Sequence, residues 1–296
     1  MRKTIFLTIA ATVLSSILQA APVQKPTPDA KRMQEAIQLF DNDDRVGAFP
    51  ILLSLEGTQD SRIIARLGAC YLSGRGVKQD VKRGFECFSK AQDDPDGIGL
   101  NGLGSCYGYG IVVEQDTAKA VDLWEKAWEK GNLYAASNLG NHHMKAGDLK
   151  KAKEYLTTAL KTNRGHKTIR GIMEFKMFSI ATREKDEKTA EHYFEQARSH
   201  GYPAYLHAAV LFNSGEEGFP LNPEKAFDLA KKSGDRSLIG EIGFGIGIEK
   251  MLGLHGNLWV NQREIHQNPS SVKRQSGITA PVGRFYSVCR LTAART

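Results

Sequence analysis

A segment in the first half of the chain returns 36 positions later with its chemistry preserved. Residues 65–80 read ARLGACYLSGRGVKQD, and residues 100–116 read LNGLGSCYGYGIVVEQD. The shared positions are Leu67/Leu103, Gly68/Gly104, Cys70/Cys106, Tyr71/Tyr107, Val77/Val113 and Asp80/Asp116. Such repetition is typical of proteins in which one small supersecondary unit stacks on copies of itself. We therefore expect function to lie on an extended surface rather than in one deep cleft.

Pairs of small residues seven positions apart extend the repeat along the chain. These pairs are Gly47/Ser54, Gly84/Ala91, Ala120/Ala127, Ala152/Ala159, Ala190/Ala197 and Ala226/Ser233. Residues at i and i+7 share one helical stripe, and small side chains there let a neighbouring helix approach closely. The larger residues at i+4, Phe88, Trp124, Leu156 and Phe194, are expected to fill the space beside it. About six units fit between Pro28 and Gly253.

Capping residues separate two helices within each unit. Gly74, Gly110 and Gly147 follow helical segments, where glycine tolerates the positive φ of a C-cap. Asp80, Asp116 and Asp186 precede the next segments, as N-caps do. Strand signals are nearly absent. The pattern predicts an all-α fold: a right-handed α-α superhelix, or solenoid, of about six helix pairs over residues 29–254.

The motif LG-x-x-Y-x-x-G-x-G-V-x-x-D-x-x-(K/R)-(G/A), followed by an aromatic residue and KA, resembles the Sel-one-like repeat (SLR), a relative of the tetratricopeptide repeat. It is strong in residues 65–97 and 100–132, and 204–234 regains part of it. Residues 146–161 instead have the shorter loop of an ordinary tetratricopeptide repeat. The resemblance implies protein binding and, in exported members, roles in envelope assembly, signalling or host contact.

The N-terminus reads as a secretory signal peptide over residues 1–20. It begins MRK, continues through an apolar stretch from Thr4 to Leu18 and reaches small residues at Ala20. The stretch is too short for a spanning helix. We expect cleavage after Ala20, no membrane span afterwards, a Pro-rich spacer at 21–28 and a periplasmic or secreted location. An intracellular adaptor with a misread leader is the alternative.

Charge is concentrated at the two ends of the chain. The formal net charge is +7, of which the leader carries two positive charges and residues 256–296 carry a net five. The repeat body is therefore neutral, and binding to a nucleic-acid backbone, which depends on clustered Lys and Arg, is not expected. Residues 255–296 break the repeat pattern and are predicted to be an irregular, disordered basic tail.

Four cysteines in an exported chain raise the possibility of a disulfide. Cys87 could pair with Cys106 across adjoining helices, or with Cys70 within its own unit. Alternatively, Cys70 and Cys106 occupy one buried slot of the repeat and stay reduced. The histidines show no compact metal-binding spacing, so no metal and no other cofactor are predicted.

An enzyme of the cell envelope that acts on peptidoglycan or β-lactams is the alternative function. Exported members of the resembling family have been linked to β-lactams, and Ser270-Ser271-Val272-Lys273 spells Ser-x-x-Lys. However, no Ser-Asp-Asn or Lys-Thr-Gly element completes that site, and no Gly-x-Ser-x-Gly elbow is present. A non-enzymatic function is therefore preferred.

Polar residues of the first helices are the candidate contacts. In solenoids of the resembling type these helices line the concave side. The candidates beside the Leu-Gly pairs are Arg66, Ser105, Asn138, Asn141 and His142. Asn side chains offer paired donors and acceptors that suit a peptide backbone or carboxylate. The sequence thus predicts a monomeric, non-catalytic scaffold for another protein or an extended peptide.

Overall fold

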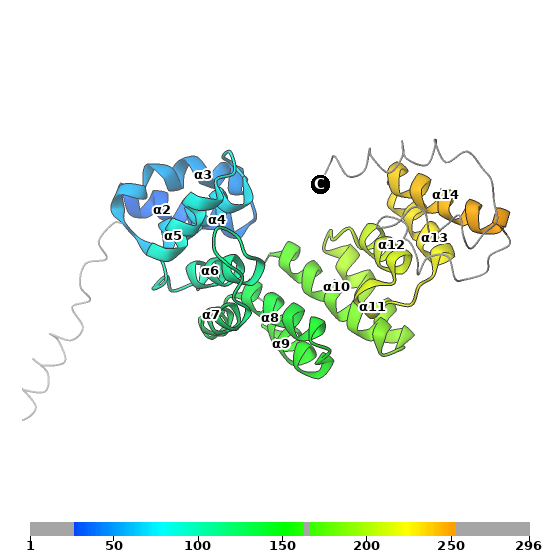
Figure 1. Ribbon diagram of the computed structural model, residues 1–296. Helices are drawn as coiled ribbons and strands as arrows, with labels where there is room; N and C mark the ends of the chain where they lie inside the picture. Colours follow the sequence, from blue (N-terminus) through cyan, green and yellow to red (C-terminus); the bar gives the residue numbers. More distant parts are fainter. Residues whose placement is uncertain (1–26, 163–165, 253–296) are drawn as a thin grey trace, which may run out of the picture. The chain divides into compact units, whose positions relative to one another are not determined.

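A computed structural model describes residues 27–162 and 166–252, with side chains as far as residue 246. Six helix pairs follow one another (Figure 1), and no strand occurs in this part of the chain. They are α2 (Pro28–Asp41) with α3 (Arg45–Ser54), α4 (Ser61–Ser73) with α5 (Val81–Lys90), α6 (Ile98–Tyr109) with α7 (Thr117–Glu129), α8 (Leu133–Lys145) with α9 (Leu149–Lys161), α10 (Lys167–Arg183) with α11 (Glu187–Ser199), and α12 (Ala204–Ser214) with α13 (Pro223–Ser233). The predicted α-solenoid of six pairs is confirmed.

The chain divides into two compact units. The first, Met1–Tyr202, contains α2 to α11, and the second, Pro203–Thr296, contains α12, α13 and α14 (Arg236–Leu252). Short 3-10 turns lie at Glu56–Thr58 and Glu216–Gly218. The expected signal peptide 1–20, most of the spacer 21–28 and the tail 255–296, with its Ser270–Lys273 motif, lie outside the described residues.

Local capping chemistry sets the helix boundaries as predicted. The Asp80 carboxylate accepts a hydrogen bond from the Arg83 backbone N–H at 3.0 Å, and Asp116 accepts one from the Lys119 N–H at 2.9 Å. Asp186 does the same at α11. Gly74 ends α4 with φ +68°, a left-handed conformation that glycine adopts without steric cost.

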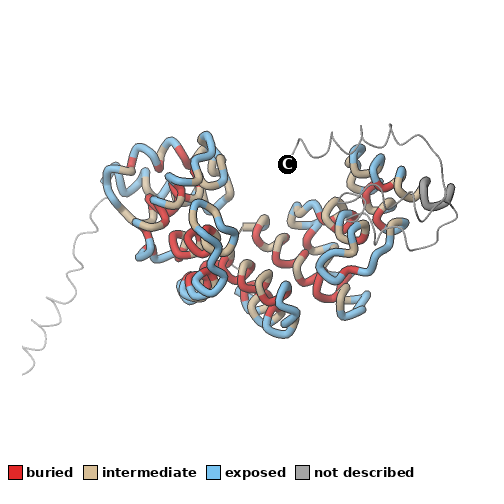
Figure 2. The backbone as a smooth tube through the Cα atoms, in the orientation of Figure 1, coloured by how far each residue is buried: buried red, intermediate tan, exposed pale blue. Residues whose placement is uncertain are grey.

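Most of the paired small residues of the second helices are buried, and buried positions recur along the helices of the structure (Figure 2). The buried members are Gly84, Ala91, Ala120, Ala127, Ala152, Ala159, Ala190, Ala197 and Ala226. A Cβ added to Gly84 would lie only 3.1 Å from the carbonyl oxygen of Gly68, so α4 and α5 touch at their backbones. In the first pair the expected register is wrong, because Ala48 is buried while Gly47 is partly exposed and Ser54 is exposed.

A cation over an aromatic ring recurs where the two helices of a pair join. The guanidinium of Arg83 lies 4.3 Å from the Tyr71 ring centre, and Lys119 Nζ lies 3.9 Å from that of Tyr107. Lys225 Nζ covers the Phe212 ring in the same way at 4.3 Å. Each contact joins the end of a first helix to the start of its second helix.

The three cysteines of the described residues are not bonded to one another. Cys70, Cys87 and Cys106 are free, buried thiols, so neither expected pairing, Cys87 with Cys106 or Cys70 with Cys87, forms in the structure. The alternative, a buried reduced slot, is what the structure has. Burial raises the pKa of the Cys70 and Cys106 thiols to about 11, which keeps both protonated at neutral pH.

Candidate peptide-binding surface

The first helices of the first unit pack side by side, with α4 against α6, α6 against α8 and α8 against α10. Partly exposed polar side chains of α6 and α8 contact one another. They belong to Asn101, Ser105 and Asn138, which we call the amide patch. Ser105 and Asn138 are two of the predicted contact residues, and the structure brings them together.

Hydrogen bonds fix the orientation of the amide patch. The Asn138 amide nitrogen donates to Asn101 Oδ1 at 3.0 Å and to Ser105 Oγ at 3.4 Å. The Ser105 hydroxyl donates to the Asn101 backbone carbonyl at 3.0 Å. No intramolecular hydrogen bond among the described residues uses the Asn101 amide nitrogen or the Asn138 carbonyl oxygen. One donor and one acceptor on adjoining helices are thus oriented and available, and a peptide unit needs one of each.

Sequence reasoning missed Asn101, although its signal was present. Asn101 precedes the predicted contact Ser105 by one helical turn. Its equivalents in the neighbouring repeats, Ala65 and Ser137, are both buried, so the repeat pattern alone did not indicate an exposed side chain there. A side chain four positions before a predicted contact lies on the same helical face.

Arg66 is not a surface contact, contrary to prediction. Its side chain is 2% exposed, and its Nη2 atom lies 3.1 Å from Asp41 and 2.8 Å from Asp96. Its Nη1 donates to the Arg62 backbone carbonyl at 3.2 Å. Arg66 therefore joins the end of α2 to the turn before α6. It was mispredicted because burial of that face of α4 depends on these distant segments.

Asn141 and His142 lie on α8, about one turn after Asn138, and are partly exposed. The His142 ring meets the His143 ring edge-on, with centres 5.1 Å apart. Neither side chain hydrogen-bonds to the amide patch. The proximity of both residues to Asn138 on one helix leaves them able to contact the same ligand.

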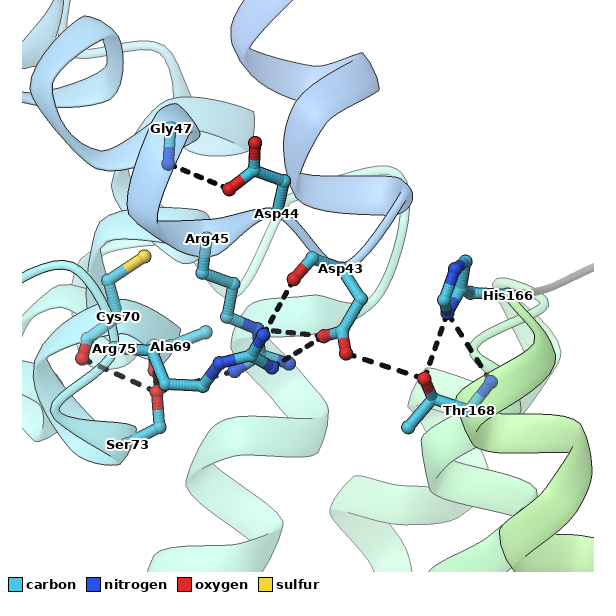
Figure 3. A network of polar contacts seen from close by, with 10 residues as sticks. All are labelled: Asp43, Asp44, Arg45, Gly47, Ala69, Cys70, Ser73, Arg75, His166 and Thr168. Atoms are coloured by element: carbon cyan, nitrogen blue, oxygen red, sulfur yellow. Dashed lines mark hydrogen bonds and ion pairs between the residues drawn. The ribbon is translucent and has the colours of Figure 1, made fainter. Parts of the chain in front are cut away.

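A second polar cluster, which the sequence did not reveal, is centred on Asp43 (Figure 3). Arg75 Nη1 and Nη2 donate to the Asp43 carboxylate and to its backbone carbonyl, both at 2.6 Å. Thr168 Oγ1, on α10, lies 3.4 Å from the other carboxylate oxygen of Asp43. We call Asp43, Arg45, Ser73, Arg75, Tyr134 and Thr168 the arginine cluster. It joins residues 125 positions apart, a distance that no repeat pattern predicts.

Tyr134 connects the arginine cluster to the amide patch. Burial raises the pKa of the Tyr134 hydroxyl, as does the Asp43 carboxylate, while the nearby Arg45 and Arg75 guanidinium groups act in the opposite direction. Tyr134 and Asn138 are four residues apart on α8, so their side chains lie on one face about one turn apart. The two groups therefore form adjoining parts of one surface.

A hollow of about 280 Å³ lies elsewhere in this unit, between α9, α10 and α11. Its floor includes Glu174, which is 2% exposed and accepts from His200 Nδ1 at 2.6 Å. That contact satisfies the buried carboxylate within the protein. Nothing else in the lining marks a reacting group.

Within the described ranges, no group of three His, Cys, Asp or Glu side chains is arranged to hold a metal ion. None of the helices in those ranges combines the length and the apolar character required to cross a bilayer.

Comparisons with known proteins identify the repeat. The model of the Sel1 repeat matches residues 64–92, 98–132, 179–202 and 203–238. The unmatched interval contains α8 and α9, where the sequence adopts the shorter tetratricopeptide-like loop. A comparison with curated proteins found no match.

Solved structures with similar folds include three bacterial proteins. One is a protective antigen of uropathogenic Escherichia coli displaying an SLR fold, with 18% identity, a TM-score of 0.48 and coverage of 70% of this chain; this chain spans 46% of that antigen's length. A Sel1 repeat protein of Oxalobacter formigenes has 18% identity, a TM-score of 0.49 and coverage of 76% and 91% of the two chains. A protein of Klebsiella pneumoniae subsp. pneumoniae, described as a sel1 repeat protein, has 20% identity, a TM-score of 0.49 and coverage of 77% and 100%.

Three of the four matched repeats coincide with helix pairs of the structure, and the fourth, 179–202, covers only the end of α10 together with α11. Residues 64–92 span α4 and α5, residues 98–132 span α6 and α7, and 203–238 spans α12 and α13. The chain therefore contains four Sel1 repeats.

Proposed function

We propose that this protein is a non-catalytic scaffold that binds an extended segment of a partner protein on the amide patch. The observation that carries the proposal is the fixed pair formed by Asn101 and Asn138, which leaves one donor and one acceptor open on adjoining helices. Sel1-repeat proteins are typically protein-interaction scaffolds, which supports this assignment. A backbone contact of this kind tolerates many side chains, so neighbouring groups must supply specificity.

Crosslinking followed by affinity purification tests the proposal. The double variant Asn101→Ala and Asn138→Ala removes the open donor and acceptor and is expected to lose the captured partner. Gln34→Ala with Gln38→Ala is the matched control, because these amides are exposed, lie one turn apart on α2 and make no side-chain hydrogen bond among the described residues. Equal capture by wild type and the Asn101/Asn138 variant would show that the amide patch does not bind the partner.

Export is the second part of the proposal, and it rests on the charged start, apolar stretch and Ala20 cleavage site of residues 1–20. N-terminal sequencing of protein from its native cell is expected to begin at Ala21. An intact Met1 in a cytosolic fraction would contradict export and favour the intracellular adaptor.

The non-catalytic part of the proposal is tested by turnover assays with nitrocefin and with muropeptides. We expect no turnover above a buffer blank. Reproducible turnover that disappears in Ser270→Ala would establish the envelope enzyme instead.

A further inference from the structure

The arginine cluster contains more hydrogen-bond donors and positive charge than it satisfies. Two guanidinium groups, Arg45 and Arg75, face one carboxylate, Asp43. Ser73, Tyr134 and Thr168 add three hydroxyl groups. The hydroxyl protons of Ser73 and Thr168 already have acceptors, so the excess is the second guanidinium group, and such an excess favours an additional anionic group.

The two arginines share the oxygen acceptors of Asp43 unequally. Arg75 takes its Oδ1 and its backbone carbonyl, each at 2.6 Å. Arg45 Nε remains 3.7 Å from Oδ1, beyond hydrogen-bond distance. The Arg45 Nε atom is buried and has no acceptor. A buried guanidinium donor left without an acceptor costs free energy that a further acceptor would recover.

The remaining contacts of Arg45 are with neutral groups. Its Nη1 lies 3.4 Å from Ser73 Oγ, whose own proton goes to the Ala69 carbonyl at 2.7 Å. The Tyr134 hydroxyl is close enough to interact with it electrostatically. Arg45 is only 16% exposed, so water screens its charge less than it screens the surface lysines.

The Asp43 backbone lies in the left-handed region, with φ +65°. A non-glycine residue there carries a modest conformational cost, although aspartate tolerates it better than most residues. Asp43 thus presents its carboxylate from a short turn between α2 and α3, where a small rearrangement would release it.

We propose that Arg45 and Arg75, with the Tyr134 hydroxyl, bind a carboxylate of the partner peptide, and that Asp43 is an internal competitor for these arginines. The site rests on the proposed function, because Tyr134 is one turn from Asn138 and the same peptide would span both. The amide patch binds the peptide backbone, and the arginine cluster selects an acidic residue or a chain terminus next to it. Binding weakens as salt rises.

Panning a random heptapeptide phage library on the purified protein provides the probe. Peptides bound by wild type are expected to be enriched in Asp and Glu. Each selected peptide is then synthesised with a free and with an amidated C-terminus, which distinguishes a terminal carboxylate from a side-chain carboxylate.

Arg75→Gln is expected to weaken the binding of the acidic peptides at least tenfold, as measured by fluorescence anisotropy. Arg83→Gln is the matched control, because Arg75 and Arg83 are 43% and 44% exposed and each pairs with one carboxylate. Arg83→Gln is expected to bind like wild type. Asp43→Asn removes the competing charge and is expected to tighten binding several-fold, with circular dichroism verifying its fold.

The outcomes separate this site from the proposed function. Neutral selected peptides that still require Asn101 and Asn138 would overturn only the carboxylate site. Acidic peptides that bind Arg75→Gln as tightly as wild type would overturn it as well. Selection of no peptide at all would overturn the proposed function and this site with it.

Discussion

At the scale of the residue, the role of a charged side chain can be assigned from sequence when its partners are local but not when they are distant. Asp80 and Asp116 could be assigned as helix caps from sequence, because a cap contacts only backbone three residues away. Arg66 could not be assigned, because its partners lie 25 and 30 positions away. Local interactions can be inferred from short patterns, whereas burial is set by segments that no short pattern connects.

Arg66→Ala is expected to lower the free energy of unfolding by about 3 kcal/mol, because it removes a buried guanidinium that joins α2, α4 and the turn before α6. Urea denaturation measures the loss. Arg62→Ala is the control: that side chain is 41% exposed in its pair with Asp60 and should cost less than about 1 kcal/mol. Equal losses would show that burial of Arg66 does not determine its contribution.

The loops after α4 and α6 share a left-handed backbone position that is a glycine in one and a valine in the other. Gly76 has φ +82°, and Val112, its equivalent in the next repeat, has φ +70°. A β-branched residue is strained there. Val112→Gly should therefore raise the free energy of unfolding by up to about 1 kcal/mol. Thermal melting would detect this, and a lower melting temperature would contradict it.

Gly76→Val is the reciprocal variant. A Cβ at Gly76 would lie 2.8 Å from the Arg45 carbonyl oxygen, so crowding adds to the strain. We expect a loss of about 2 kcal/mol or more.

At the scale of the element, α8 departs from the repeat at the position where α4 and α6 carry tyrosine. His143 replaces Tyr71 and Tyr107, and its ring stacks on Tyr155 with centres 5.7 Å apart. Burial, then Lys151 and His142, lower the pKa of His143, while Asp148 and Glu125 act in the opposite direction. This helix therefore contains a titrating group where its neighbours have none near neutral pH.

The direction of the pH effect follows from that shift. The folded state holds His143 neutral more strongly than the unfolded state does, so its contribution to stability is complete above about pH 6.5 and is lost as pH falls through the lower folded pKa. His143→Tyr should lose less stability than wild type between pH 7.5 and 5, measured by urea denaturation. His192→Gln, at an exposed site, should follow wild type. Parallel curves for all three proteins would exclude this role.

At the scale of the whole molecule, the 36-residue period predicted six helix pairs, and the structure has six. The period also implied that each pair contacts only its neighbours, as in an ideal solenoid. The first unit differs, since Asp43, in the first pair, approaches Thr168, in the fifth. Superhelical geometry brings these residues together, and small changes in helix packing accumulate over the intervening pairs. The sequence of a single repeat therefore does not determine how close the first and fifth pairs lie.

The contact between the first and fifth pairs predicts a coupling that a nearest-neighbour solenoid lacks. A double-mutant cycle of Asp43→Ala and Thr168→Val, followed by urea denaturation, should give an interaction energy of about 0.5–1 kcal/mol, because one hydrogen bond is lost in either single variant. The cycle of Asp43→Ala with Thr189→Val is the control, since Thr189 lies on α11 and bonds to Asp186 instead. An interaction energy near zero in both cycles would show that each helix pair of this unit is energetically coupled only to its neighbours. A nonzero value in the first cycle alone would show that the arginine cluster couples the first and fifth helix pairs energetically. A ligand that displaced Asp43 would then weaken that coupling.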